Sequence, residues 1–214
     1  MSKTNHPDTP IERINWTVGA DDSHTMRSRY DTWAENYDSD LVNTDNYAAP
    51  AFTVNVIKES IPASARILDA GCGTGIVGEE FARCGFTSLV GFDYSPGMLA
   101  QARIKGVYAD LVEGDLNQPL PFASDSFDAV VQVGSILHID GTCFHEFVRV
   151  LKPGGRIFFC GWAKVFEEGG FQRNVDELIA AEKLQLESVS GSFQALPVSE
   201  PEIVYRLFIY NTAA

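Results

Sequence analysis

Short apolar runs alternate with helix-like segments over most of this chain, and that alternation restricts its fold more than any other feature. Five runs have the composition of buried strands: 66–71, 89–95, 107–115, 127–134 and 156–162. Helical patterns cover 76–86, 95–106, 142–151 and 171–184. Apolar strands that alternate with helices predict a parallel sheet with helices on both faces. Ligands of such sheets bind at the carboxyl ends of the strands.

The C-terminal part contains two further strand-like runs, 187–195 and 203–211. Only the residues LPVSEPE join them. A linker of that length is too short for a helical crossover, so we expect this pair to be antiparallel. The length of 214 residues suits one sizeable domain, which we expect over residues 26–214.

The N-terminal part contains two segments with different sequence patterns. Residues 1–25 are polar and show no hydrophobic period, which is typical of a flexible arm. Tyr30, Trp33 and Tyr37 then recur at helical spacing, so one face of a helix is expected to carry all three rings. A second helix is expected over 49–60.

The composition excludes several classes of protein. Hydrophobic residues make up 45% and charged residues 21% of the chain, which is ordinary for a globular protein in water. The net charge of −13 repels phosphate backbones and disfavours a nucleic-acid partner. No apolar run is long enough for a membrane span, and the N-terminus lacks the apolar core of a secretion signal. The four cysteines show no CxxC pair, which predicts a cytoplasmic protein without a metal site.

The stretch LDAGCGTG, residues 68–75, ends the first core strand in a glycine-rich loop. Such a loop can hold phosphate, a dinucleotide or S-adenosylmethionine. A phosphate loop needs GxxxxGK[ST], and no lysine or arginine occurs between Arg66 and Arg83. The phosphate-loop interpretation therefore fails.

The dinucleotide interpretation has real support. Gly73, Gly75 and Gly78 spell GxGxxG, and Asp93 lies where a ribose-binding acid is expected. Two observations oppose it. The strand already ends at Gly71, so the GxGxxG match begins two residues after the strand end. Asp69 would also repel a pyrophosphate at the mouth of the loop.

A ligand with an ammonium and a sulfonium group suits a carboxylate at this position, and S-adenosylmethionine is such a ligand. Asp69, Asp93 and Asp115 follow three successive strands, each about one strand–helix unit from the next. One acid at a strand end is typical of a helix cap, whereas three at this period favour a binding site. An NAD(P)-dependent oxidoreductase remains the alternative.

Four motifs in this order resemble the class I S-adenosylmethionine-dependent methyltransferases: DAGCGTG, GFDYSPGML, EGDLNQPLPFASDSFDAVV and LKPGGRIFF. The resemblance covers about residues 27–162. Within that class, YDTWAENYDSD, GCGTGIVGEEF, SPGMLAQA and VVQVGSILH are most similar to the methyltransferase-like proteins of the Williams–Beuren syndrome region. The resemblance implies a Rossmann-like α/β fold with a seven-stranded mixed sheet of order 3-2-1-4-5-7-6. It also implies in-line methyl transfer from S-adenosylmethionine, which leaves S-adenosylhomocysteine.

The resemblance assigns the methionine and ribose parts of the cofactor to the first two strand ends. Gly71 and Gly73 would let the backbone approach the methionine part, with Cys72 between them as a small loop residue. Asp69 would orient the loop or contact the cofactor directly. Asp93 would accept hydrogen bonds from both ribose hydroxyls.

The adenine is assigned to the second and third strand ends. Tyr94 and Met98 would lie against the ring, Asp115 would accept from the exocyclic amine, and the backbone of Leu116 would meet a ring nitrogen. At the end of the fourth strand, the carbonyl of Val133 would accept from the amino group of the cofactor.

The remaining candidates belong to the lid and the acceptor. The aromatic helix within residues 26–60 would form a lid, with Tyr30 and Tyr37 near the carboxylate of the cofactor and Trp33 near the substrate. Trp162 is a candidate for the substrate wall. His138 is a candidate general base or a pocket-lining residue.

Two absences bear on the acceptor. The segment after the fifth predicted strand is short, which predicts a pocket that is open or closed mainly by the N-terminal arm. An NPPY-like motif is absent after the fourth strand, where VQVGS stands, and this disfavours nucleic-acid and glutamine substrates. A small-molecule acceptor is therefore expected. A cofactor-binding protein without methyl transfer remains open, as does the oligomeric state.

Overall fold

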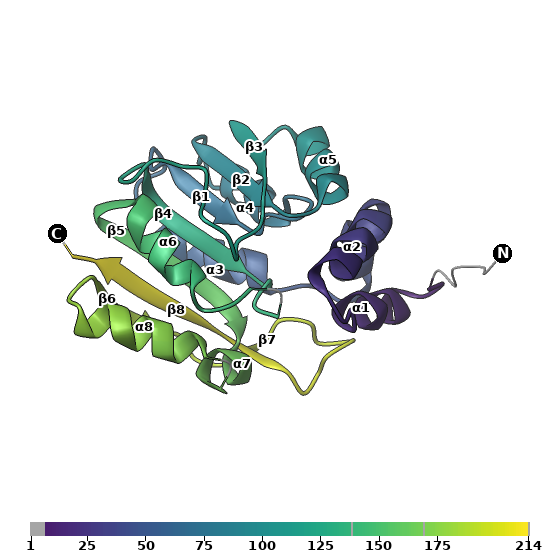
Figure 1. Cartoon of the computed structure of the whole chain (residues 1–214). Coiled ribbons are helices and arrows are strands. Elements are labelled where there is room, and N and C mark those ends of the chain that lie inside the picture. Colours follow the sequence, from purple (N-terminus) through teal and green to yellow (C-terminus); the bar gives the residue numbers. More distant parts are fainter. Residues whose placement is uncertain (1–6, 138, 169, 214) are drawn as a thin grey trace.

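The computed structural model describes residues 7–137, 139–168 and 170–213 (Figure 1). Within them, seven strands pair in the order β3-β2-β1-β4-β5-β8-β6, and a short β7 pairs with β8. Their bounds are β1 Ile67–Ala70, β2 Leu89–Asp93, β3 Asp110–Glu113, β4 Phe127–Val133, β5 Leu151–Trp162, β6 Leu184–Val189, β7 Phe193–Gln194 and β8 Val204–Thr212. The order matches the expected one, with β8 in the place of the seventh strand.

Helices cover both faces of this sheet. Their bounds are α1 Pro10–Val18, α2 Ser23–Asp38, the π-helical η1 Ser39–Thr44, α3 Ala49–Ile57, α4 Ile76–Arg83, α5 Pro96–Lys105, α6 Cys143–Val150, α7 Ala163–Glu168 and α8 Phe171–Ala180. Apolar side chains of α3 and α4 pack on one face, as Ile57 and Phe81 do against Ile67. Those of α6, α7 and α8 pack on the other face (Figure 1). The expectation of helices on both faces is confirmed.

The strand directions follow the lengths of the connections. Strands β2, β1, β4 and β5 run parallel, with Ile67 of β1 opposite Leu89 of β2 and opposite Ala129 of β4. Strand β8 is antiparallel to β5, β6 and β7. The predicted antiparallel end of the sheet is therefore confirmed.

The run 187–195 does not form one strand as expected. Strand β6 begins earlier, at Leu184, and ends at Val189, and β7 holds only two residues. Serine and glycine at 190–192 separate them, and glycine weakens a strand interior because it has no side chain to pack. The extra strand in the sheet arises from this interruption.

Helix α1 lies inside the segment expected to be an arm without regular structure. Its start is a capping box, in which Thr9 accepts from the amide of Glu12 and the Glu12 carboxylate accepts from the amide of Thr9. Pro10 occupies the first turn, where its missing amide hydrogen costs nothing. Ile14 is buried against Trp33 of α2. The prediction missed this helix because its pattern is short and only one face of it is covered.

None of the helices in the described ranges is long and apolar enough to cross a membrane. In Figure 1, α1 and α2 lie together beyond one end of the strands, on the side away from the C-terminus. The residues of α2 that face the strands close a pocket, and the arrangement of that pocket decides what the chain can bind.

Candidate cofactor site

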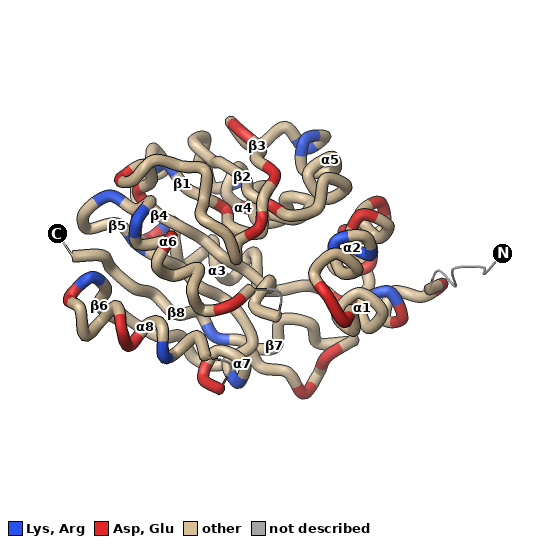
Figure 2. Tube along the Cα trace, viewed as in Figure 1, with Lys and Arg blue, Asp and Glu red and all other residues tan. Residues whose placement is uncertain are grey.

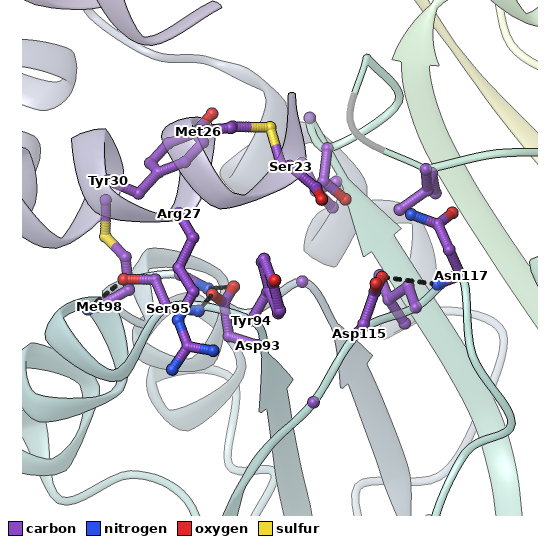
Figure 3. A pocket seen from close by; sticks show the side chains of 18 of the residues that line it. Ser23, Met26, Arg27, Tyr30, Asp93, Tyr94, Ser95, Met98, Asp115 and Asn117 are labelled. Carbon is purple, nitrogen blue, oxygen red and sulfur yellow. Dashed lines mark hydrogen bonds between the residues drawn. The ribbon is translucent and has the colours of Figure 1, made fainter. Parts of the chain in front are cut away.

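A pocket lies between α2 and the carboxyl ends of β1, β2 and β4 (Figure 3). It holds about 770 Å³ of space outside the protein atoms, open solvent at its mouth included. Its lining comprises Ser23, Met26, Arg27, Tyr30, Tyr37, Gly71, Gly73, Asp93, Tyr94, Ser95, Met98, Gly114, Asp115, Leu116, Asn117, Val133, Gly134, Ser135 and Ile139. The pocket therefore lies where the strand pattern predicted a ligand.

Asp93 joins two loops at the centre of the pocket. Its Oδ2 accepts from the amide of Gly73 at 2.8 Å, and its Oδ1 accepts from the amide of Ser95 at 2.9 Å. Burial raises the pKa of Asp93, while these amide hydrogen bonds act to lower it. Each carboxylate oxygen has a second lone pair, so Asp93 can also accept from ligand hydroxyls.

Asp115 lines the pocket at the next strand end. Its Oδ1 accepts from the amide of Asn117 at 2.9 Å, which fixes the turn after β3 (Figure 3). Leu116 is buried beside it, and Met98 is held on α5 by a hydrogen bond from its amide to the hydroxyl of Ser95 at 3.0 Å. This end of the pocket combines apolar surface with a carboxylate.

The end of β4 supplies the opposite wall. Val133 and Gly134 line the pocket, and a Cβ atom at Gly134 would overlap the hydroxyl of Tyr47. The glycine thus lets Tyr47 lie directly over the strand end. Ser135 accepts a hydrogen bond from Gln132 at 2.5 Å.

Helix α2 is fastened across the pocket. Asp31 Oδ1 accepts from the Ser95 hydroxyl at 2.6 Å and from the amide of Gly97 at 2.8 Å. A Cβ atom at Gly97 would lie 2.8 Å from the Cα of Asp31, so α2 approaches α5 closely only because glycine is there. The guanidinium of Arg27 lies 4.9 Å from the centre of the Tyr94 ring and pairs with Glu113. These contacts hold α2 over the ligand space.

Ten of the predicted cofactor residues meet in this one pocket. They are Tyr30, Tyr37, Gly71, Gly73, Asp93, Tyr94, Met98, Asp115, Leu116 and Val133. They come from α2, α5 and the ends of the four strands β1, β2, β3 and β4, which are far apart in the chain. His138, the candidate base, lies outside the residues that the structure describes.

Two predicted cofactor residues lie beneath the loop and outside the pocket. Asp69 is 1% exposed and accepts from the hydroxyl of Tyr108 at 2.6 Å. Cys72 is buried, and its sulfur packs against Gly91 of β2. Neither residue is in the lining of the pocket, and direct contact of Asp69 or Cys72 with a ligand stays a prediction.

The two tryptophans expected near the substrate, Trp33 and Trp162, are not in the lining of this pocket. The indole nitrogen of Trp33 donates to Asp40 at 2.7 Å, and its ring packs on Ile14 within the N-terminal helices. Trp162 lies opposite Tyr205 of β8 and packs against both hydrophobic cores of the sheet. Trp33 is buried, whereas Trp162 is only partly buried.

Several residues of the site were missed. Arg27 lies one turn before Tyr30, and Asp31 follows it directly. Helical spacing alone could not show that Arg27 reaches β3 and that Asp31 reaches α5. Gly97 offered a usable signal, since glycine in the first turn of a helix indicates a close approach by another element. Ser135 and Asn117 follow strand ends, but no sequence motif marked them as residues of the site.

Residues 68–159 match the sequence model of a known family, described as a methyltransferase domain. The chain contains a class I methyltransferase domain. The cofactor of this class is S-adenosylmethionine, and the pocket fits it. The carboxylates of Asp93 and Asp115 suit hydroxyl and amine donors, while the cation in the lining, Arg27, is paired with Glu113.

Curated relatives of this methyltransferase domain differ in their stated substrates. The chain is 43% identical over 151 residues to human Methyltransferase-like protein 27. The matched region covers 68% of this chain and 61% of the relative. It is 34% identical over 141 residues to a demethylmenaquinone methyltransferase of Streptomyces avermitilis, and the matched region covers 64% of this chain and 60% of the relative. It is 29% identical to an 18S rRNA (guanine-N7)-methyltransferase of Saccharomyces cerevisiae over 149 residues, 64% of this chain and 50% of the relative. The chain thus spans about three fifths or less of these relatives.

Known structures share the fold of the methyltransferase domain. A TehB-like S-adenosylmethionine-dependent methyltransferase from Corynebacterium glutamicum superposes with a TM-score of 0.62 at 22% identity, covering 87% of this chain and 99% of the other. The [4+2]-cyclase SpnF superposes with a TM-score of 0.61 at 17% identity, covering 77% of this chain and 82% of the other. At these identities the likeness concerns the fold alone.

Proposed function

We propose that this protein transfers the methyl group of S-adenosylmethionine to a small-molecule acceptor. The observation that carries the proposal is one pocket in which Asp93, Asp115 and the backbone at Gly71 and Gly73 converge from three strand ends. Bound there, the cofactor supplies a methyl group on a positively charged sulfur. The narrower resemblance to the methyltransferase-like proteins of the Williams–Beuren syndrome region rests on the motifs alone and stays a proposal.

The contacts would run along the pocket. Asp93 would accept from the ribose hydroxyls through the lone pairs that the amides of Gly73 and Ser95 leave free. Asp115 would accept from the adenine amine, and Met98 would lie against the ring. At the other end, the carbonyl of Val133 would accept from the amino group.

The acceptor would enter beside Tyr30 and Tyr37. Burial raises the pKa of both hydroxyls, so they stay neutral and can donate hydrogen bonds. Tyr47 packs with them in the same cluster and lies over Gly134. Neutral hydroxyls and aromatic faces suit an organic acceptor that has an apolar face and an atom able to accept a hydrogen bond.

The segment that contains Tyr47 is bonded to the loop between β7 and β8. Asp45 is buried and accepts from the amides of Val198 and Ser199 at 2.8 and 2.9 Å, which fixes the loop between β7 and β8 to the N-terminal part. The amide of Ala48 donates to the carbonyl of Ala195 at 2.9 Å. These contacts lie on either side of Tyr47 in the chain and hold its segment in place.

The charge distribution supports the same acceptor class. Figure 2 shows Lys and Arg scattered over separate elements, with acidic residues among them. A net charge of −13, with Lys and Arg dispersed in this way over the described residues, opposes the binding of a phosphate backbone. We also infer a cytoplasmic location, which the free cysteines Cys72, Cys84, Cys143 and Cys160 support.

In-line transfer requires alignment of the acceptor and exclusion of water, and α2 would provide both. Asp31→Ala removes the carboxylate that accepts from Ser95 and Gly97. We expect about tenfold weaker binding of S-adenosylhomocysteine, or ~1.4 kcal/mol, by isothermal titration calorimetry. Thr32→Ala is the matched control, because its hydroxyl donates only to Ser28 within α2. Equal affinities of the two variants would contradict the role of α2.

The acceptor class is tested by methyl transfer itself. The protein is incubated with cofactor labelled in the methyl group, together with a small-molecule extract, total RNA or total protein. We expect label in the small-molecule fraction, where mass spectrometry can identify the product. Label in RNA or protein alone would overturn the acceptor class. Binding of the cofactor with no transfer to any fraction would favour a cofactor-binding protein on the same fold, because a fold does not by itself fix an activity.

A further inference from the structure

Tyr108 lies just before β3 and occupies a space that glycines leave open beneath the cofactor loop. A Cβ atom at Gly75 would lie 3.0 Å from its ring carbon Cε2, one at Gly78 would lie 2.8 Å from the same atom, and one at Gly91 would lie 3.2 Å from Cδ1. The three glycines come from the loop, from α4 and from β2. Any side chain at Gly78 would displace the ring.

The ring position brings the hydroxyl of Tyr108 to Asp69. The hydroxyl donates to Oδ2 of Asp69 at 2.6 Å, and Asp69 is 1% exposed. Among the described residues no hydrogen-bond partner reaches the buried Oδ1. A buried carboxylate with one donor is poorly compensated, so Tyr108 is decisive for its charge.

Other ionisable groups around Asp69 do not compensate for its burial. Burial raises the pKa of Asp69 to about 7, the hydrogen bond from Tyr108 lowers it, and the charge of Asp93 raises it. Cys72 is buried nearby, and its thiol pKa is raised by the same surroundings. Lys105 of α5 pairs with Asp38 and Glu79.

We propose that Tyr108 is a positioning residue that keeps Asp69 ionised beneath the glycine loop, so that the loop presents negative charge to a positively charged cofactor. The inference rests on the proposed function, because the benefit of the charge depends on the ammonium and sulfonium of the ligand. It also explains the GxGxxG letters of this chain. Gly75 and Gly78 make room for Tyr108 and do not approach a pyrophosphate.

Cofactor binding should strengthen as the pH rises, because the ionised form of Asp69 is the one that favours binding. Above about pH 7 Asp69 is charged in the free protein and binding is strong, and below that pH a proton must leave before the charge is available. Loss of one hydrogen bond to a carboxylate moves its midpoint upward by about one pH unit. At pH 7 the ionised fraction then falls from about a half to about a tenth, which weakens binding about fivefold.

The experiment is calorimetric titration of the full chain with S-adenosylmethionine, which carries both the ammonium and the sulfonium, between pH 5.5 and pH 9. For Tyr108→Phe we expect the fall in affinity about one pH unit higher than in wild type, with the two affinities converging near pH 9. Tyr210→Phe, which removes a hydroxyl from a buried ring in the other core, should follow the wild-type profile. For Asp69→Asn the fall should disappear.

Three results would overturn the inference. The first is a common midpoint for Tyr108→Phe and wild type, even if the variant is less stable, because a merely structural role moves stability without moving the profile. The second is a fall in affinity that persists in Asp69→Asn. The third is no binding by wild type at any pH, which would overturn the proposed function at the same time and so differs from the first two.

Discussion

Replacement of Asp93 by alanine weakens the binding of S-adenosylhomocysteine by about 2–4 kcal/mol, because charge-assisted hydrogen bonds to the ribose are lost. The amides of Gly73 and Ser95 lose their acceptor at the same time, so the two loops also lose their connection. Isothermal titration calorimetry measures the effect. A folded variant with an unchanged dissociation constant would show that the ribose is bound elsewhere.

The control for this prediction is Asp176→Ala. Asp176 is an exposed carboxylate on α8, where it accepts from Gln172, and it lies outside the pocket lining. The Asp176→Ala substitution removes the same charge from the chain as Asp93→Ala, so any change in long-range electrostatics appears in both variants. We expect affinity within about twofold of wild type for Asp176→Ala.

Replacement of Asp40 by alanine destabilises the N-terminal helices by about 3 kcal/mol. Asp40 accepts from Arg13 through two hydrogen bonds of 2.6 and 2.8 Å and from the indole of Trp33 at 2.7 Å. The side chain of Arg13 is only 12% exposed, so the variant leaves a cation largely buried without a carboxylate. Hydrogen exchange of the amides of α1 and α2 measures the loss, since these helices can open without the sheet.

The same network has a defined pH dependence. Burial alone would raise the pKa of Asp40, but Arg13 and Trp33 outweigh it and the pKa is lowered. A lowered pKa means that the stabilisation is present above about pH 4 and is lost as the pH falls further. Asp21→Ala, at an exposed position before α2, should leave exchange unchanged. Wild-type protection of α1 in Asp40→Ala would contradict the account.

The sequence predicted the strand-end residues of the site because the strand–helix period is a property of the local pattern. Asp93 and Asp115 follow buried strands, and parallel strands bring their carboxyl ends to one edge. Their convergence in one pocket therefore needed no knowledge of side-chain packing. The position of α2 over that edge depended on Asp31 and Gly97, which belong to different elements. No local pattern contains such a pair.

Contacts with distant parts of the chain decide where Trp33 and Asp69 lie. Trp33 has the spacing of a lid residue, but a helix has several faces, and the face with Trp33 is covered by α1. Because α1 itself was missed, nothing in the sequence indicated a partner for that ring other than the ligand. Asp69 was placed correctly at the strand end. Its burial depends on Tyr108, which lies 39 residues away in the chain.

The central claim is that the pocket under α2 holds S-adenosylmethionine, and parallel titrations of the wild-type chain with S-adenosylhomocysteine and with NAD⁺ test it most directly. The account predicts saturable one-to-one binding of S-adenosylhomocysteine and no binding of NAD⁺ under the same conditions. Saturable binding of NAD⁺ with no response to S-adenosylhomocysteine would contradict it, and would restore the dinucleotide interpretation of the glycine loop.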